Sequence, residues 1–181
     1  MILSDSELVE MLREPRTRRE AFAVLVKQYS EKLYWKVRRI VLSHEDANDV
    51  LQNVFIKVWS NLQNFQGKSS LSTWLYRIAV NESLDFLRKQ KLADKVSTDE
   101  DDSVASRLMS DEYFDGDEVQ TRLQEAVARL PEVQRTVFNL KYFEEMKYSE
   151  ISQILNTSEG ALKASYHLAV KKITEYLHLF D

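Results

Sequence analysis

Two neighbouring segments, residues 44–62 and 71–89, each repeat apolar side chains at the spacing of an α-helix. In the first segment the apolar positions recur every three or four residues: Ala47, Val50, Leu51, Val54, Phe55, Val58 and Leu62. The second segment repeats the pattern with Trp74, Leu75, Ile78 and Ala79. A helix with one apolar face has to bury that face against another element. The segments therefore predict a pair of packed helices joined by a short polar loop.

Helical signals continue towards both ends of the chain. Ser/Thr-x-x-Glu capping boxes at residues 4–7 and 17–20 predict two helices near the N-terminus, and apolar periodicity returns from residue 119 onwards. The 181 residues include only three glycines and two prolines, which leaves few sites for the tight turns of a strand-rich fold. The fold class is therefore predicted as all-α, with small helical domains over residues 1–93 and 119–181.

The stretch between these two domains, residues 94–118, has a different character. It holds ten acidic side chains against two basic ones, Lys95 and Arg107, and shows little helical periodicity. A segment of this composition cannot bury enough apolar surface to fold alone, so we expect an acidic flexible linker. The acidic run 99–102 lacks the glycine and the ligand spacing of a calcium loop, which favours solvated charge over a metal site.

Several functional classes are disfavoured by what the sequence lacks. It has no cysteine, no apolar run of about 18 residues and no secretory signal pattern. We therefore expect no disulfide, no insertion in a membrane and a cytoplasmic location. No phosphate loop, HExxH motif or nucleophile elbow occurs. We expect no enzymatic activity, no catalytic or metal-binding residue, no cofactor and no small-molecule substrate.

The C-terminal part of the chain has the pattern of a helix-turn-helix. A short helix over residues 149–155 is followed by the polar turn 156–158 and a longer helix. The second helix of such a motif can place its N-terminal half in the major groove of DNA. The residues expected to meet DNA are the predicted cap Ser158, the exposed positions Glu159, Lys163, Ala164, Ser165 and His167, and the phosphate-binding Lys171 and Lys172. From this pattern alone, an ordinary αα-hairpin is the alternative.

Both ends of the chain resemble one known family. DANDVLQNVFIKVW (46–59) followed by SSLSTWLYRIAVN (69–81) resembles region 2 of the bacterial RNA polymerase sigma factors of the extracytoplasmic-function (ECF) group. SEGALKASYHLAVKKI (158–173) resembles the helix of region 4 that reads the −35 promoter element. Ser165 and Leu168 stand where the family often has arginine, which leaves fewer charged contacts to DNA.

The resemblance implies partners and roles for individual residues. The partners are core RNA polymerase, through its β′ coiled coil and β subunit, promoter DNA and an anti-sigma factor. Asp49, Gln52 and Asn53 match the positions that dock on β′. The residues that match the −10 pocket loop and the helix after it are Phe65, Gln66, Gly67, Lys68, Ser69, Ser70, Trp74, Arg77, Asn81 and Arg88. For Trp74 the alternative is a place in the protein core. For Arg88 the alternative is a favourable interaction with the C-terminal end of its own helix.

The predicted function is that of an ECF sigma factor, which gives core polymerase its promoter specificity and helps to melt DNA. In such a protein the acidic linker implies mimicry of nucleic acid in the polymerase channels, with a plain tether as the alternative. Two other functions are weighed against this one. A helix-turn-helix regulator that acts without polymerase is disfavoured because residues 1–93 contain no phosphoacceptor α/β domain. A helical adaptor without DNA contact is disfavoured by the TWLYRIAVN stretch and its polar loop.

Overall fold

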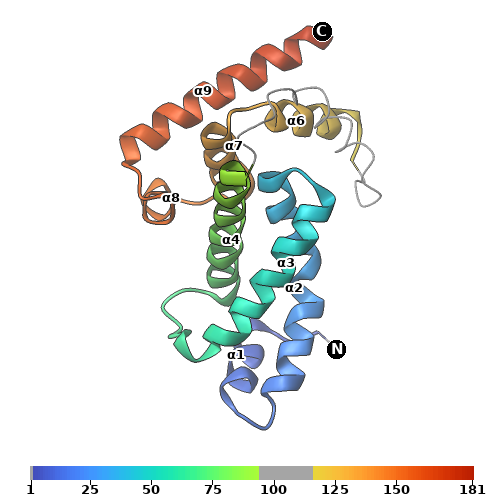
Figure 1. Ribbon diagram of the computed structural model, residues 1–181, viewed down its shortest axis with the longest axis vertical. Helices are drawn as coiled ribbons and strands as arrows, with labels where there is room; N and C mark the ends of the chain where they lie inside the picture. The colour runs from blue at the N-terminus through green and yellow to red at the C-terminus, as the bar shows by residue number, and fades with distance from the viewer. Residues whose placement is uncertain (1, 94–115) are drawn as a thin grey trace. The chain divides into compact units, whose positions relative to one another are not determined.

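The computed structural model describes residues 2–93 and 116–181. Every regular element in these two ranges is a helix, and no β-strand occurs in them, which confirms the predicted all-α class (Figure 1). The predicted linker, residues 94–118, lies outside the described residues except for residues 116–118. The chain forms two compact units. The first contains α1 to α4 and the second contains α6 to α9, and each is described by itself.

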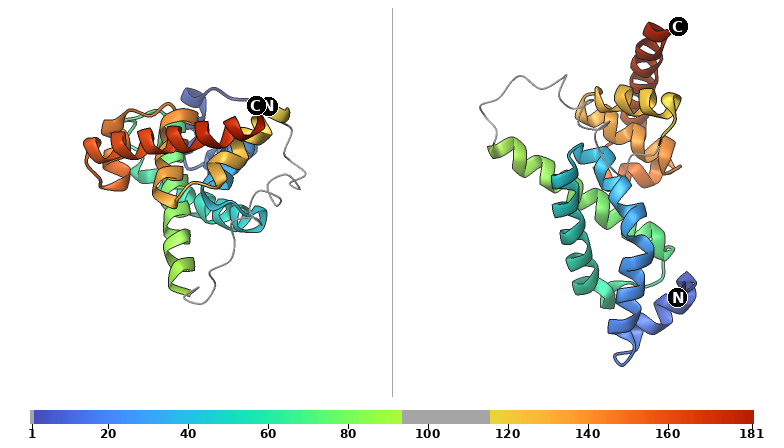
Figure 2. Two further views of the ribbon diagram at one scale, coloured as in Figure 1. Left: turned by 90° about the horizontal axis from the view of Figure 1, so that it is seen from above. Right: turned by 90° about the vertical axis from the view of Figure 1, so that its right-hand side faces the viewer.

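The first unit is built from helices α1 (Asp5–Arg13), α2 (Arg18–Val41), α3 (His44–Asn61) and α4 (Leu71–Ala93), with a short 3₁₀ turn, η1 (Leu62–Asn64), after α3. α2 contacts both α1 and α4, and Figure 2 shows α3 lying along α2. The first predicted capping box is present, because Glu7 N–H donates to Ser4 Oγ (3.3 Å) and Ser4 N–H donates to Glu7 Oε2 (2.8 Å). At Thr17 the hydroxyl instead donates to the Met11 carbonyl (2.8 Å).

The core of the first unit combines buried positions of the two predicted apolar faces, on α3 and α4, with buried side chains of α2. Each of α2, α3 and α4 contributes side chains that are at most 2% exposed: Leu25, Leu33, Val37, Val50, Val54, Val58, Leu71, Leu75 and Ala79. Full burial of an aliphatic side chain stabilises a fold by roughly 1.5–3 kcal/mol relative to leaving it exposed. Because these side chains are buried, the polar faces of α3 and α4 are directed towards solvent.

The second unit is built from α6 (Glu118–Ala128), α7 (Glu132–Phe138), α8 (Tyr148–Leu155) and α9 (Glu159–Leu177), with a 3₁₀ turn, η3 (His178–Phe180), after α9. Its core contains Val127, Leu130, Phe138, Ala169 and Ile173. α7 continues into a π-helical turn, η2 (Asn139–Phe143), which the periodicity does not predict. In this turn Glu144 N–H donates to the carbonyl five residues back, on Asn139 (3.2 Å).

A stack of aromatic rings joins the π-helical turn to α9. Phe138 stacks with Tyr142 at 5.0 Å between ring centroids and 14° between ring planes, and with Tyr166 at 5.8 Å and 15°. Tyr148, at the start of α8, meets Tyr166 edge-on at 6.4 Å. Aromatic pairs of these geometries are worth about 0.5–1.5 kcal/mol each beyond the area that they bury. The stack therefore helps to fix α8 and α9 relative to α7.

The half-buried Lys36 on α2 predicts a pH dependence of stability for the first unit. Its Nζ lies 3.9 Å from the centroid of the Tyr76 ring. Burial, reinforced by the positive charges of Arg39 and Lys32, lowers the pKa of Lys36 from 10.5 to about 8. Between pH 8 and 10.5 the unfolded chain therefore binds more protons at this site than the folded chain. The free energy of unfolding should rise with pH in that window, by about 1 kcal/mol after allowance for solvent screening.

Trp fluorescence can measure this effect, because all three tryptophans, at positions 35, 59 and 74, lie in the first unit. We expect urea unfolding midpoints of the native protein to rise from pH 7.5 to pH 9.5. Lys36→Met should be more stable than the native protein at pH 7.5 and should lose most of the rise. If the unfolding midpoints of the two proteins rose equally with pH, Lys36 would not be the cause of the pH dependence.

Candidate functional site

The three residues predicted to dock on polymerase form a polar stripe on α3, which we call the α3 stripe: Asp49, Gln52 and Asn53. All three side chains are exposed, on the side of α3 opposite the buried Val50, Val54 and Val58. None of the three makes an ion pair or a side-chain hydrogen bond within the described part of the chain. The α3 stripe is therefore open to a partner, and α3 is held by its other face.

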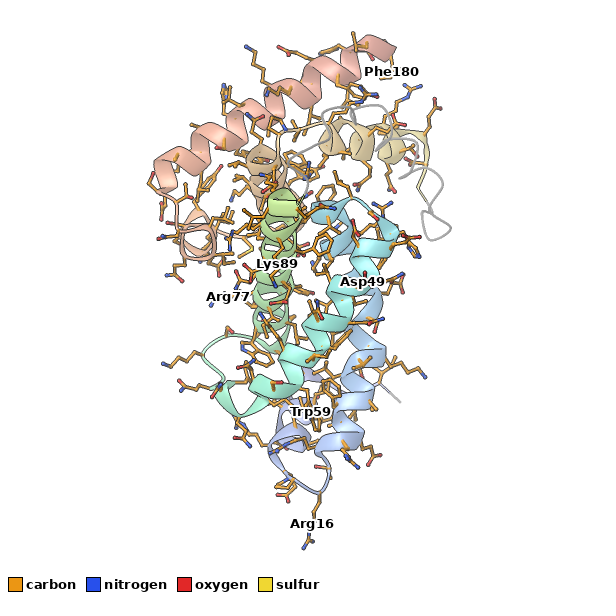
Figure 3. All side chains as sticks on the ribbon, viewed as in Figure 1. Arg16, Asp49, Trp59, Arg77, Lys89 and Phe180 are labelled. Atoms are coloured by element: carbon orange, nitrogen blue, oxygen red, sulfur yellow. The ribbon has the colours of Figure 1, made fainter. Side chains whose placement is uncertain are left out.

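Two exposed apolar residues lie beside the α3 stripe and were not assigned a role from the sequence. Ile56, one turn after Gln52 and Asn53, is 62% exposed, and Trp59 is 41% exposed. One side of the Trp59 ring meets Phe22 on α2 at 5.0 Å between centroids, and Figure 3 shows Asp49 and Trp59 near opposite ends of α3. The signal that could have found Ile56 is an apolar residue within a polar helix face.

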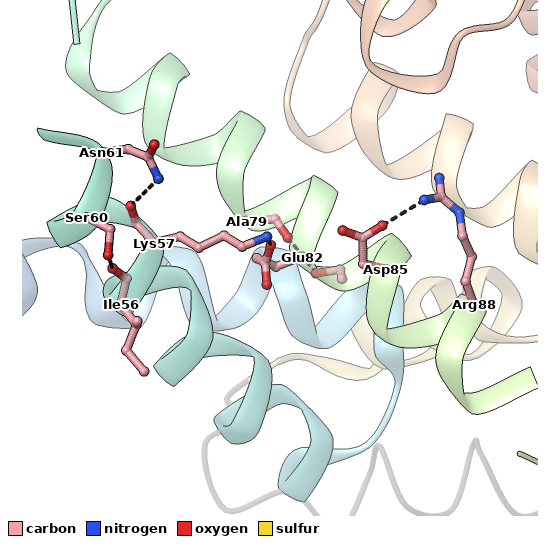
Figure 4. A network of polar contacts seen from close by, with 9 residues as sticks. Ile56, Lys57, Ser60, Asn61, Ala79, Glu82, Asp85 and Arg88 are labelled. Atoms are coloured by element: carbon pink, nitrogen blue, oxygen red, sulfur yellow. Dashed lines mark hydrogen bonds and ion pairs between the residues drawn. The ribbon is translucent and has the colours of Figure 1, made fainter. Parts of the chain in front are cut away.

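Polar contacts on the flank of α3 fix its orientation against α4 (Figure 4). Lys57 makes an ion pair with Glu82 of α4, whose side chain is only 10% exposed. The hydrogen bond to Glu82 raises the pKa of Lys57, so the pair stays charged well above neutral pH. Ser60 and Asn61 donate back to the carbonyls of Ile56 and Lys57 at 2.9 and 2.8 Å. Lys57 thus joins α3 to α4.

The loop between η1 and α4 carries the residues predicted to read the −10 element. Phe65 is half-buried and its ring lies 5.0 Å from the ring of Trp74 on α4, tilted by 47°. Gln66 and Lys68 are exposed, and Ser69 is half-buried. Gly67 has φ of +71°, a left-handed conformation that glycine adopts without strain. The structure thus brings the predicted loop residues together with Trp74.

Ser70 has a structural role in addition to its predicted one. Thr73 N–H donates to Ser70 Oγ (3.1 Å), and the Ser70 hydroxyl donates to Thr73 Oγ1 (2.8 Å). These bonds cap the first turn of α4, an interaction typically worth about 1 kcal/mol. A substitution at Ser70 would therefore disturb helix stability as well as any contact with nucleic acid.

Four more residues were predicted to read the −10 element: Trp74, Arg77, Asn81 and Arg88. They share one side of α4, because they are separated by three, four and seven residues. Trp74 and Arg77 are half-buried, whereas Asn81 and Arg88 are exposed. Arg77 Nε is buried with no hydrogen-bond partner among the described residues. Arg88 pairs with Asp85 at 2.7 Å (Figure 4). This side of α4 therefore offers an aromatic ring and two guanidinium groups within one stripe.

The second unit contains the predicted helix-turn-helix in α8 and α9. Asn156 ends α8 in a left-handed conformation, with φ of +50°. Ser152 Oγ donates to the Thr157 carbonyl (2.7 Å) and holds the turn closed. Ser158 caps α9, because Ala161 N–H donates to its Oγ (3.2 Å). The two helices are therefore joined by a turn whose polar groups are satisfied locally.

Most of the residues predicted to meet DNA are exposed on α9 or at its start. Leu162, Ala169 and Ile173 face the core of the unit, whereas Ser165 is half-buried and lies towards that buried side. The exposed members of the predicted set are Ser158, Glu159, Lys163, Ala164, His167, Lys171 and Lys172. Ser165 is therefore the member of the set least available to a ligand.

Tyr148 is a residue at this surface that sequence reasoning did not single out. Lys163 Nζ lies 5.7 Å from the centroid of its ring, and Lys141 Nζ lies 4.8 Å from it. Lys141 also donates to the Met146 carbonyl (3.2 Å). A cation near the face of an aromatic ring is stabilised by about 0.5–1 kcal/mol at an exposed site. The ring thus restrains Lys163. The contact joins residues of two different helices, α8 and α9, so the sequence alone does not show it.

Residues 2–93 and 116–181 contain neither a metal-binding cluster nor a membrane-spanning helix. No group of three or more His, Cys, Asp or Glu side chains is arranged to hold a metal ion. No helix of these ranges is both long enough and apolar enough to cross a bilayer.

Comparison with known families finds two matches in the chain. Residues 25–93 match Sigma-70 region 2, and residues 120–173 match Sigma-70 region 4. The ECF RNA polymerase sigma factor SigW of Bacillus subtilis is 34% identical over 157 residues, which cover 82% of this chain and 84% of SigW. The RNA polymerase sigma-H factor of Pseudomonas aeruginosa is 32% identical over 182 residues, with 96% and 93% covered.

Two solved structures have a similar fold. The sigma factor RpoE of Bartonella quintana, solved in complex with the anti-sigma factor NepR, aligns with a TM-score of 0.68 at 21% identity, covering 87% of this chain and 96% of that one. CnrH, solved with the cytosolic domain of CnrY, aligns with a TM-score of 0.64 at 20% identity, covering 98% and 99%.

Proposed function

The chain belongs to the ECF group of RNA polymerase sigma factors, and we propose that it binds core RNA polymerase and directs promoter-specific transcription initiation. The observation that carries this proposal is the occurrence of both sigma regions in one chain, in order, with 34% identity to an ECF sigma factor. The family is not a class of enzymes, so we further propose that the protein itself catalyses no reaction. It acts where RNA polymerase acts, in the cytoplasm.

The first unit is proposed to dock on polymerase through the α3 stripe. Its carboxylate and two amides are exposed and unpaired among the described residues, and such groups offer charge complementarity and hydrogen bonds to a basic partner helix. Ile56, one turn after Gln52 and Asn53, adds an exposed apolar side chain next to the stripe. Protein–protein interfaces combine apolar contacts with polar groups in this way. The β′ coiled coil and the β subunit are the proposed partners.

The loop and the exposed side of α4 are proposed to capture the melted −10 element. Capture of an unstacked base requires a stacking surface and hydrogen-bonding groups for its edge. Phe65 and Trp74 supply the aromatic surface, and Gln66 and Lys68 are exposed beside it. Arg77 and Asn81 lie further along α4 and can bind the strand. Arg88 can bind phosphate when it leaves Asp85.

The second unit is proposed to read the −35 element as duplex DNA. The N-terminal half of α9 would enter the major groove, with Lys163 and His167 one helical turn apart on its exposed side. Lys171 and Lys172 lie about one turn beyond His167, where they can contact phosphates. An anti-sigma factor is a further proposed partner, as expected for this family.

Tyr148 gives a sharp test of how Lys163 is positioned. Tyr148→Phe keeps the ring beside Lys163, whereas Tyr148→Leu removes it. We expect Tyr148→Leu to weaken binding to upstream promoter DNA by about two- to fivefold, the equivalent of one exposed cation–π contact, and Tyr148→Phe to bind as the native protein does. Fluorescence anisotropy with duplex DNA provides the measurement. Equal weakening in both variants would point to the hydroxyl group instead of the ring.

Run-off transcription with purified core polymerase on genomic fragments tests the proposed function. Promoter-specific transcripts that require this protein are the expected result. A regulator that acts without docking would bind DNA but would not form a complex with core polymerase in the absence of DNA. A helical adaptor would give neither transcripts nor DNA binding. Each alternative therefore predicts a distinct outcome.

A further inference from the structure

One acidic side chain lies on the side of α4 that is proposed to bind a DNA strand. Asp85 stands four residues after Asn81 and three residues before Arg88, and residues at these spacings are neighbours on a helix surface. The Asp85 side chain is 44% exposed and that of Arg88 is 69% exposed. A carboxylate at this position repels the phosphates of any strand that approaches. We therefore asked which group of the protein Asp85 serves.

In the structure Asp85 is the partner of Arg88. Arg88 Nη1 donates to Asp85 Oδ1 at 2.7 Å, and Figure 4 shows the carboxylate directed at the guanidinium. Hydrogen bonds between ionised groups are short and stronger than those between neutral groups. The guanidinium group binds carboxylates and phosphates with the same N–H donors. The Asp85 carboxylate thus occupies a donor of Arg88 that a DNA phosphate would need.

The surroundings of Asp85 allow Arg88 to leave it at little cost. The pair is exposed, and exposed ion pairs are weak because water solvates both charges. A second cation lies close to Asp85. The hydrogen bond to Glu82 raises the pKa of Lys57, and the charge of Asp85 acts on Lys57 in the same direction. A carboxylate released by Arg88 therefore stays beside a positive charge and in contact with water, so no isolated buried charge is created.

We propose that Asp85 competes with DNA phosphate for Arg88, so that a bound strand has to displace this carboxylate before Arg88 can contact it. Asp85 thereby weakens the contact of α4 with every strand to the same degree, because phosphates carry no sequence information. Asp85 is a positioning residue in this scheme, since it acts on DNA only through Arg88. The inference rests on the proposed function, because it starts from the assignment of Arg88 to a strand phosphate.

The experiment uses the full chain with core polymerase on a promoter first identified by run-off transcription. Two pre-melted templates are compared, one with the native −10 sequence and one with that sequence scrambled. Asp85→Asn removes the charge at nearly constant size, and Asp85→Glu keeps it. Arg88→Ala is measured alone and combined with Asp85→Asn. The matched control is Glu31→Gln, which removes one negative charge at an exposed position on α2.

Asp85→Asn should strengthen binding about two- to fivefold on both templates, the range expected for one exposed ion pair. Asp85→Glu and Glu31→Gln should bind as the native protein does. In the Arg88→Ala background the gain from Asp85→Asn should be lost, because the carboxylate then has no guanidinium to occupy.

Three results would overturn the inference. The first is the absence of any gain from Asp85→Asn. The second is an equal gain with and without Arg88, which would indicate general repulsion of DNA by the carboxylate. The third is a gain on the native −10 sequence alone, which would indicate a contact with a base. Absence of promoter-specific transcripts with the native protein would instead refute the proposed function.

Discussion

Replacing Asp49 and Gln52 together by alanine is expected to weaken the complex with core RNA polymerase by about 10- to 100-fold, or roughly 1.4–2.8 kcal/mol. Both side chains are exposed and unpaired among the described residues, so the fold gains nothing from them. In the proposed complex they would lose water and meet donors of the partner helix. Removing them leaves those donors unsatisfied, which is the more costly part of the change. Fluorescence anisotropy of the labelled protein against core polymerase gives the dissociation constant.

The control for this double variant changes the same types of residue elsewhere on the first unit. Glu31 and Gln90 are both exposed and lie outside the α3 stripe. Glu31→Ala with Gln90→Ala should bind core polymerase as the native protein does. Circular dichroism should show the same helix content for all three proteins. Native affinity in the double variant at Asp49 and Gln52 would exclude this face of α3 from docking.

Replacing Lys163 by alanine should weaken binding to the upstream duplex by about 1–3 kcal/mol if Lys163 contacts a base edge. It should leave transcription from a template with a melted −10 segment nearly unchanged, because that segment is proposed to bind the first unit. Replacing Gln66 by alanine should have the reverse effect. Gln66 is a better choice than Ser70 for this purpose, since Ser70 also caps α4. The measurement is binding and transcription on duplex and pre-melted promoters.

Lys27→Ala provides the control for loss of one positive charge, because Lys27 is exposed on α2 outside every proposed contact surface. Repeating the measurements at two salt concentrations separates two roles for Lys163. A base contact weakens binding to the preferred sequence alone, whereas a phosphate contact weakens all sequences and reduces the salt dependence. If the Lys163 and Gln66 variants fail equally on both templates, promoter reading is not divided between the two units as proposed.

The helices of this protein could be predicted from the sequence because side chains at the periodic apolar positions are buried in the structure. Val50, Val54 and Val58 recur every four residues, and all three are buried on α3. Ser4 and Glu7 match a capping box and form one. The exposure of Asp49 and Lys163 followed from the same periodicity, since each lies off the apolar face. The polymerase-binding and −10-binding roles of individual residues came from the family resemblance, and the DNA-binding roles of the α9 residues came from the helix-turn-helix pattern. All of these roles stay predictions.

Other features could not be predicted because they depend on contacts between elements. Val133 fits the apolar pattern yet is 61% exposed, although Val137, one turn later on the same side of α7, is fully buried. Arg38 is only 1% exposed on α2, where a charged residue would be placed on the surface by composition alone. The approach of Arg13 to Gly67 and of Lys163 to Tyr148 joins residues on different elements. Local sequence patterns carry no information about such pairs.

The π-helical turn Asn139–Phe143 holds one residue more than an α-helical turn. Deleting Lys141 should therefore convert it into a regular turn at the end of α7. Phe138 and Tyr142, whose rings stack at 5.0 Å, would then be three residues apart instead of four, and their ring contact would change. A homologue that lacks one residue between positions 139 and 143 should therefore have an α-helical turn here and a different aromatic contact beside α9.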